Sequence, residues 1–226
     1  MDSSRPVLRG RVSLASSLLI ALVLAACAAR LPRLVPPSGG IEAVEGFGSA
    51  SIAGAEASLK GKFGFVFRAP ELGRVEAVDP IGRTVFVIVF RDGRAWFALP
   101  GRKVYAEDDA ETMMERFLGL ALRPGEVIHL ISGAWPDEGG RWGIERDPEG
   151  RVVRGVDGEF SFAVRSFFPG DAVPHEIGLE GPTASGRVKV LKLGFNPEPR
   201  AEAFDTAFLR AYAPKTWDEI LELLDR

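Results

Sequence analysis

Apolar and polar residues alternate with a period of two along most of the chain between residues 41 and 195. This period is typical of β-strands that bury one face. The run 84–90 is apolar on both faces, so it must be covered on both sides or line an apolar cavity on one. The pattern predicts about ten or eleven strands, at 41–52, 59–68, 71–78, 84–90, 95–99, 102–106, 141–146, 151–156, 159–168, 175–181 and 187–195.

A helix is predicted over residues 110–118, where apolar positions recur at helical spacing and form one face. Asp108 is the predicted N-cap, Glu111 completes a capping box with it, and Gly119 ends the helix. The apolar face of this helix must lie against another apolar surface.

Three further segments have helical signals. A short helix is predicted over 127–131, and helical structure is predicted over 204–212 in the C-terminal tail. An amphipathic helix is predicted over 216–225, where Thr216 and Glu219 have the spacing of a capping box. In the strand region, the alternation slips at Val190-Leu191, which predicts a β-bulge.

These elements predict a mainly β (α+β) fold, in which a large curved antiparallel sheet has helices inserted in mid-sheet and an added C-terminal helix. A length of 226 residues fits one all-β domain with additions. We expect a signal peptide over 1–26, a lipidated N-terminus and flexible tether over 27–40, the sheet domain over 41–196, and a C-terminal helical extension over 197–226 that packs on the domain.

The N-terminus has the features of a secretory signal. Arg5, Arg9 and Arg11 precede a short apolar run over 18–26, which is too short for a stable membrane span. The run Leu-Ala-Ala-Cys that ends at Cys27 resembles a bacterial lipobox, whose cysteine is lipidated. The alternative is an ordinary signal peptide followed by a chance cysteine.

The residues after Cys27 predict where the protein is anchored. Several acyl chains on this cysteine would hold the protein firmly on a membrane. Ala28 stands where an aspartate would resemble an inner-membrane retention signal, so the outer membrane is favoured. Prolines and glycines over 28–40 prevent regular structure and predict a tether.

Charge and composition argue against several classes of function. Residues 1–26 carry three arginines and one aspartate, a net +2, so the −3 of the whole chain becomes −5 without them. No basic stripe remains to neutralise phosphates, so no nucleic-acid partner is expected. One cysteine excludes an internal disulfide, and two distant histidines make no zinc site.

No catalytic or metal constellation is evident. The acidic run at 107–111 could ligate a metal, but acidic residues at a helix start are expected from the helix dipole. His129 and His175 have no neighbouring nucleophile and are interpreted as structural. We therefore expect no enzyme activity, no metal, no cofactor and a monomeric protein.

Several motifs, taken in order, resemble one family. After the lipobox come Asp-Pro-Ile-Gly at 79–82, Tyr-Ala-Glu-Asp-Asp-Ala-Glu at 105–111 and Leu-Gly-Leu-Ala-Leu-Arg-Pro at 118–124. This order resembles the LolB-like outer-membrane lipoproteins of the LolA/LolB lipoprotein-localisation fold. The resemblance is best over 79–133 and looser over 41–195.

The resemblance implies an open, strongly curved antiparallel half-barrel whose concave side is covered by helices. It implies that the protein faces the periplasm, accepts other lipoproteins from a LolA-like carrier, binds their acyl chains in an apolar cavity and helps insert them into the outer membrane. It also assigns membrane insertion to the loop of Pro80, Ile81 and Gly82, in which Ile81 holds the position of an exposed leucine. Without the resemblance, the alternative that Ile81 packs inward between the strands is favoured.

The cavity is expected to lie between the 59–67 and 84–90 strands and the 110–118 helix, with a volume of a few hundred Å³ or more. Methionines suit variable acyl chains because their side chains adapt in shape. The candidate lining residues are Leu59, Phe63, Phe65, Phe67, Phe86, Ile88, Phe90, Met113, Met114, Phe117 and Leu118.

Two features depart from the family. The stretch 28–40 has no N-terminal helix, and the chain continues past Asn196 with helical segments. These departures leave a second hypothesis open: an accessory or structural outer-membrane lipoprotein of the same fold that binds lipid but has no transfer role.

Overall fold

The computed structural model describes residues 31–54, 58–137, 139–170 and 172–224. The predicted signal peptide and Cys27 lie outside the described residues. The chain divides into two units at Pro32, and the sheet domain belongs to the second unit, Arg33–Arg226. Within the described residues, no helix combines the length and the apolar character needed to cross a membrane.

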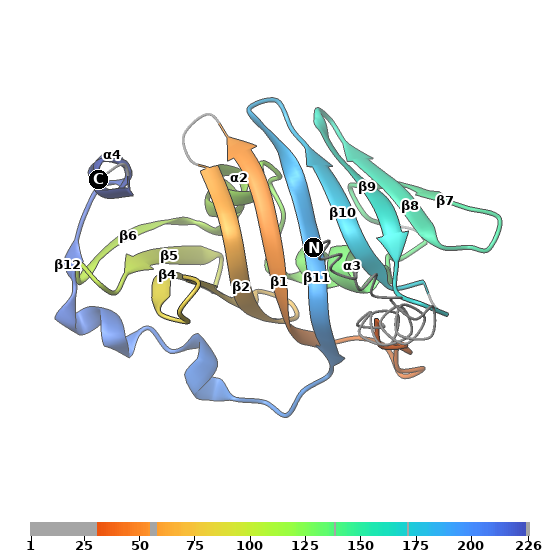
Figure 1. Cartoon of the computed structure of the whole chain (residues 1–226), viewed down its shortest axis with the longest axis horizontal. Coiled ribbons are helices and arrows are strands. Elements are labelled where there is room, and N and C mark those ends of the chain that lie inside the picture. The colour runs from red at the N-terminus through yellow and green to blue at the C-terminus, as the bar shows by residue number, and fades with distance from the viewer. Residues whose placement is uncertain (1–30, 55–57, 138, 171, 225–226) are drawn as a thin grey trace, which may run out of the picture. The chain divides into compact units, whose positions relative to one another are not determined.

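The described residues form one curved sheet of 12 strands in the order β12-β6-β5-β4-β3-β2-β1-β11-β10-β9-β8-β7 (Figure 1). This confirms the predicted fold class. The long strands β1 and β11 pair with each other and join the two halves of the sheet. The strands are β1 Ala43–Gly54, β2 Ser58–Arg68, β3 Leu72–Val78, β4 Thr84–Arg91, β5 Arg94–Leu99, β6 Val104–Asp109, β7 Gly143–Arg146, β8 Val152–Asp157, β9 Phe160–Phe167, β10 Pro174–Glu180, β11 Ala184–Phe195 and β12 Ala213–Pro214.

The pairing of β1 with β11 contains the predicted bulge. Phe47 pairs with Lys192 and Gly48 pairs with Val190, which leaves Leu191 as the extra residue. On the other side of β1, glycines make room for the aromatic side chains of β2. A Cβ atom at Gly46 would lie 2.6 Å from the Phe65 ring, so only glycine allows this ring to lie across β1.

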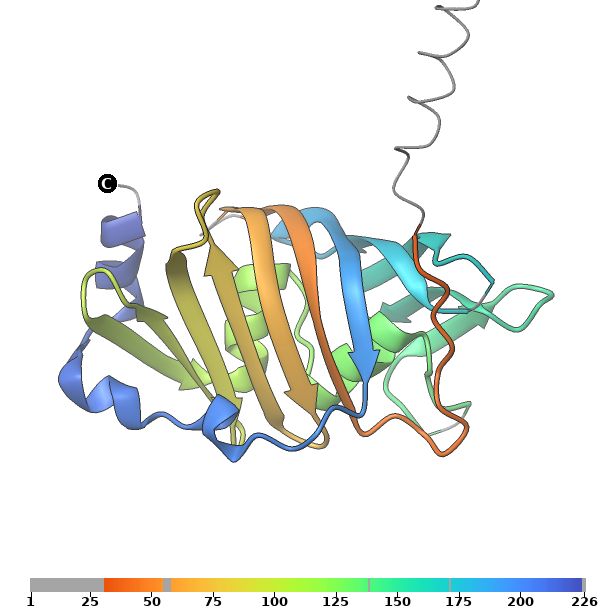
Figure 2. The ribbon, with the colours of Figure 1, turned by 60° about the horizontal axis from the view of Figure 1, so that its bottom comes forward.

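Two helices, α2 (Ala110–Leu118) and α3 (Pro124–Ser132), lie on one face of the sheet (Figure 2). The N-cap of α2 is Asp109, whose carboxylate accepts a hydrogen bond of 2.9 Å from the backbone N–H of Thr112. The prediction of Asp108 was therefore wrong by one residue. The reason is that β6 continues to Asp109, while the side chain of Asp108 pairs with Arg116.

Helix α3 begins earlier than the predicted 127–131. Pro124 occupies the first turn, where its missing N–H costs nothing. The Glu126 carboxylate accepts a 2.8 Å hydrogen bond from the backbone N–H of Arg123, which fixes the start of the helix. Gly119 and Gly133 end α2 and α3 in the left-handed conformation, at φ 71° and 74°.

The C-terminal segment crosses the face of the sheet opposite to α2 and α3 (Figure 2). The predicted helical stretch 204–212 forms two short 3-10 helices, η1 (Ala201–Phe204) and η2 (Ala207–Ala211). Helix η1 contacts β3 and β4, and its Phe204 is buried. Val87 and Val89 lie on the face of β4 that η1 contacts, and both are buried. This contact explains why β4 is apolar on both faces.

The segment then passes around the edge of the sheet. Strand β12 pairs with β6 in parallel, which accounts for the twelfth strand. Helix α4 (Trp217–Leu224) follows, and Thr216 and Glu219 form its predicted capping box through hydrogen bonds of 2.8 and 3.3 Å. Trp217 packs edge-on against Phe97 of β5, with ring centroids 5.5 Å apart.

Candidate ligand-binding cleft

An apolar cleft lies between the concave face of the sheet and helices α2 and α3. Every residue that lines it is apolar, and its volume is about 60 Å³. The lining comes from five strands and both helices, because the curvature of the sheet brings β10 and β11 opposite β4. The lining residues are Phe63, Phe67, Val75, Phe86, Ile88, Phe90, Met114, Leu118, Val127, Leu130, Ile131, Ile177, Leu179 and Val188.

The structure brings most of the predicted lining residues together at this cleft. Those that line it are Phe63, Phe67, Phe86, Ile88, Phe90, Met114 and Leu118.

Two predicted lining residues, Phe65 and Met113, are buried but do not line the cleft. Phe65 instead packs over Gly46. Met113 and Met114 are neighbours on a helix, about 100° apart around its axis, and only Met114 lines the cleft. The side chains of Leu59 and Phe117 lie outside the described residues.

Sequence reasoning missed Val75 of β3 and the lining residues from α3, β10 and β11. The signal was present in the apolar positions of 127–131 and in the alternation of the late strands. It did not show that these segments fold back over β2 and β4, since that contact joins residues far apart in the chain.

The expected volume of a few hundred Å³ is not reached. Ligand pockets are usually about 300–1,000 Å³, and here the side chains of α2 and α3 occupy most of the concave face. Met114 and Leu118 from α2, together with Ile131 from α3, project into the space. An acyl chain can therefore enter only if the two helices move away from the sheet.

An ion cluster centred on Arg141 holds both helices to the sheet. Its guanidinium lies 3.0 Å from the Glu111 carboxylate of α2, 2.7 Å from the Glu126 carboxylate of α3 and 3.3 Å from Asp157 at the end of β8. Arg123 adds a contact of 2.8 Å to Glu111. We call these five residues the Arg141 latch, because they join the two helices to each other and to the sheet.

The charges of the latch stabilise one another. The hydrogen bond from Arg141 to Glu126 raises the pKa of Arg141 above its ordinary value. Partial burial raises the pKa of Glu111, but the hydrogen bond from Arg123 and the charges of both arginines outweigh it, so the pKa lies below 4.5. Stability from ionised Glu111 is therefore present above the pKa of the unfolded chain and is lost as the pH falls through the lower folded value.

The loop between β3 and β4 presents Ile81 to solvent, with its side chain 75% exposed. The Asp79 carboxylate accepts hydrogen bonds from the backbone N–H groups of Ile81 (3.0 Å) and Arg83 (2.9 Å), and from the Arg83 guanidinium (2.7 Å). The Arg83 side chain holds the pKa of Asp79 below its ordinary value. Gly82, at φ 84°, closes the turn. Exposure of Ile81 agrees with what the resemblance implied, and it contradicts the alternative in which Ile81 packs inward between the strands.

The acidic side chains at 107–111 form ion pairs with arginines or cap α2. Glu107 lies 2.7 Å from Arg94 and Asp108 lies 3.2 Å from Arg116, while Asp109 caps α2. Among the described residues, no group of three or more histidine, cysteine or acidic side chains could hold a metal ion.

Both histidines bind backbone carbonyls. His175 is buried, and its Nδ1–H donates to the carbonyl of Val190 at 2.8 Å. The Nδ1–H of His129 donates to the carbonyl of Ala134 at 2.7 Å, which ties α3 to the segment that follows it.

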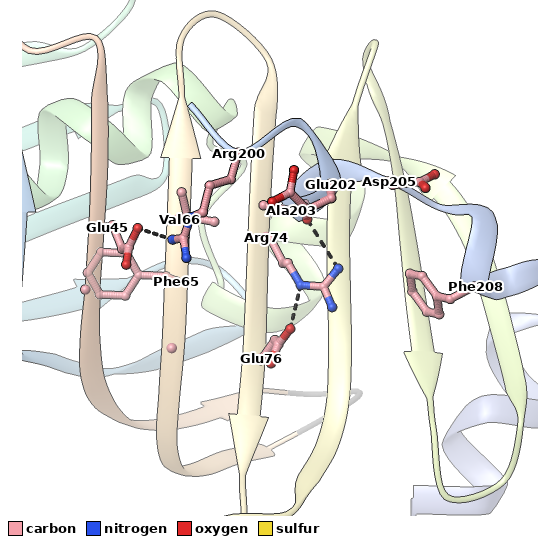
Figure 3. Close-up of a pocket in the computed structure, with 12 residues that line it drawn as sticks. Glu45, Phe65, Val66, Arg74, Glu76, Arg200, Glu202, Ala203, Asp205 and Phe208 are labelled. Carbon is pink, nitrogen blue, oxygen red and sulfur yellow. Dashed lines mark hydrogen bonds and ion pairs between the residues drawn. The ribbon is translucent and has the colours of Figure 1, made fainter. Parts of the chain in front are cut away.

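A second hollow, of about 600 Å³, lies on the opposite face between the sheet and the C-terminal segment (Figure 3). Its walls are charged as well as apolar. Arg74 lies 2.5 Å from Glu76 and donates to the carbonyl of Ala203 at 3.3 Å, and Arg200 pairs with Glu45. These contacts fasten the C-terminal segment to β1 and β3. The hollow could not be predicted from the sequence, because only the return of the chain over the sheet creates it.

No protein-family model matches the chain, and no curated protein sequence matches it. A DUF1329 family protein from Desulfovibrio piger is structurally similar, with 9% identity, coverage of 86% of this chain and 98% of that chain, and a TM-score of 0.47. A LolA superfamily protein from Nitrosomonas europaea has 10% identity, coverage of 84% and 98%, and a TM-score of 0.49. Because both TM-scores are below 0.5, the fold assignment rests on the sheet topology described above.

Proposed function

We propose that this protein binds the acyl chains of lipoproteins between its curved sheet and its helices, and helps insert these lipoproteins into the outer membrane. The observation that carries the proposal is the wholly apolar lining of the cleft. A linear hydrocarbon chain is the ligand such a surface would take, since each buried methylene contributes about 0.8 kcal/mol and no polar group is needed. The motif order over 79–133 and the exposed Ile81 support the same reading.

Binding requires the cleft to open. Helices α2 and α3 are short and are joined by the loop residues 119–123, and the Arg141 latch fixes them at their solvent-facing side. Separation of the helices from the sheet would expose the aromatic floor formed by Phe63, Phe67 and Phe90. The acyl chain would then replace helix side chains as the partner of that floor.

We expect the protein to bind a fluorescent fatty acid at micromolar concentrations. Leu118→Glu should weaken this binding more than tenfold, because it brings a charge to the lining of the apolar cleft at a half-buried position that can tolerate a polar side chain. Leu191→Glu is the matched control, since Leu191 is an exposed leucine that does not line the cleft. Absence of binding by the unmodified chain, or equal weakening by both variants, would contradict the proposal.

We further propose that the protein is anchored in the outer membrane through lipidated Cys27 and faces the periplasm. Cys27→Ser removes the thiol that receives the lipid, so the variant should neither incorporate labelled fatty acid nor sediment with membranes. The measurement is metabolic labelling together with membrane fractionation. A variant that is still labelled and still membrane-bound would show that the lipobox interpretation is wrong.

A second candidate function is an accessory lipid-binding lipoprotein without a transfer role. The C-terminal segment favours it, because η1, β12 and α4 cover both faces and one edge of the sheet. A carrier docking on those surfaces would meet this segment first. Complementation separates the two functions: rescue of a strain depleted of its own lipoprotein receptor supports transfer, and failure despite correct localisation supports the accessory role.

A further inference from the structure

A cluster of aromatic rings lies beyond the end of α3. Trp135 stacks on Phe162 of β9, with ring centroids 5.4 Å apart and an interplanar angle of 16°. Trp142 lies 5.8 Å from Trp135 and 5.6 Å from Phe162, and the His129 ring lies 5.5 Å from Trp135. The three rings of Trp135, Trp142 and Phe162 all contact one another and join the segment after α3 to β9, and we call them the wall.

The two tryptophans in this wall have unsatisfied donors. Trp135 is only 8% exposed and Trp142 only 6%. Both indole nitrogens are buried from solvent, and neither has a hydrogen-bond acceptor among the described residues. A buried N–H without an acceptor destabilises the protein, and native structures contain few of them. Two such donors within one cluster therefore point to an acceptor that the closed form does not supply.

The wall adjoins the apolar cleft. Leu179 and Ile131 line the cleft. Leu179 pairs directly with Phe162 in the sheet, and neighbouring strands are about 4.8 Å apart. Trp135 follows Ile131 by four residues, just beyond the end of α3. A ligand whose chain fills the cleft therefore has one end beside Phe162 and the indoles that pack on it.

Both tryptophans of the wall also line a smaller hollow of about 110 Å³, together with Arg146 and two glycines. Arg146 donates to the carbonyl of Trp135 at 2.9 Å and to Asp137 at 2.9 Å, which gives this hollow a polar border.

We propose that the indole N–H groups of Trp135 and Trp142 hold the carbonyl oxygens that join acyl chains to the head of a lipid, as ester or amide. An indole N–H can only donate, so its partner must be an acceptor. The carbonyl is the first acceptor beyond a hydrocarbon chain, and it would lie at the wall when the chain lies in the cleft. This inference rests on the proposed function, because it requires the chain to occupy the cleft.

The Arg141 latch contacts both helices and also includes a residue of the segment that carries the indoles. Arg141 belongs to the segment between Trp135 and Trp142 and also binds Glu111 of α2 and Glu126 of α3. Release of Arg141 would free the helices to leave the sheet and would free this segment to turn its indoles. Opening of the cleft and presentation of the donors are thus one movement.

The test compares methyl laurate with tridecane, which has a similar length but no acceptor, both delivered from cyclodextrin to the protein labelled with ¹⁵N-tryptophan. Methyl laurate should shift the indole N–H resonances of Trp135 and Trp142 downfield, whereas tridecane should not. Trp135→Phe and Trp142→Phe, which remove the N–H and keep an aromatic ring, should each reduce the preference for methyl laurate over tridecane about 3- to 10-fold.

Trp96→Phe is the matched control, because Trp96 lies on β5 outside the wall, and it should leave the preference unchanged. If both probes bind but the two indole resonances and the preference do not respond, the inference is overturned while the proposed function stands. If neither probe binds, the proposed function fails and the inference fails with it.

Discussion

Ile220→Ala is expected to lower the free energy of unfolding by about 2–5 kcal/mol, the usual cost of removing a fully buried isoleucine side chain. Ile220 is the one fully buried side chain of α4, the last helix described. Trp217, one turn earlier, packs on Phe97, and Arg116 of α2 lies 5.0 Å over the Trp217 ring. Loss of Ile220 therefore weakens the packing of α4, which contacts β6 and carries these Trp217 contacts.

The control is Leu224→Ala on the same helix. Leu224 is 38% exposed, so we expect a change within about 0.5 kcal/mol. Both variants are measured by equilibrium urea unfolding followed by tryptophan fluorescence. A change at Ile220 as small as that at Leu224 would mean that α4 does not pack on the sheet in solution.

Ile81→Glu is expected to leave stability nearly unchanged and to reduce the transfer of bound lipoprotein into liposomes at least tenfold. The side chain is 75% exposed, so its replacement should alter the free energy of unfolding by no more than about 0.5 kcal/mol. Insertion of an isoleucine into a bilayer gains about 1.5–3 kcal/mol, and a glutamate loses this gain and adds the cost of a charge. Since 1.4 kcal/mol corresponds to tenfold, a large loss of transfer follows.

Two further variants isolate the role of this position. Ile81→Leu keeps an apolar tip and should retain transfer. Leu191→Glu places the same charge at another exposed aliphatic residue and should also retain it. A marked fall in melting temperature for Ile81→Glu would show that the loop packs inward, and unchanged transfer by a stable Ile81→Glu protein would refute the insertion role.

Local interactions in the sequence were sufficient to predict most elements. Strand positions followed from alternation, because adjacent residues of a strand point to opposite faces. The bulge at Leu191 and the ends of α2 and α3 at Gly119 and Gly133 followed from local pattern and backbone preference. The exposed tip at Ile81 followed from the family resemblance, because the local residues alone favoured an Ile81 packed inward between the strands. In the structure Asp79, Gly82 and Arg83 form the turn among themselves.

Contacts between residues far apart in the chain decided the rest. Which aspartate caps α2 depended on how far β6 remained paired with β5, and the small volume of the cleft depended on how closely two helices fit one curved sheet. The double-sided apolar character of β4 was visible in the sequence, but only the folded chain showed that η1 covers its outer face. Arg141 binds carboxylates 15 and 30 residues earlier in the chain. Periodicity carries no information on such pairs, because it records which face a residue occupies and not which distant surface that face meets.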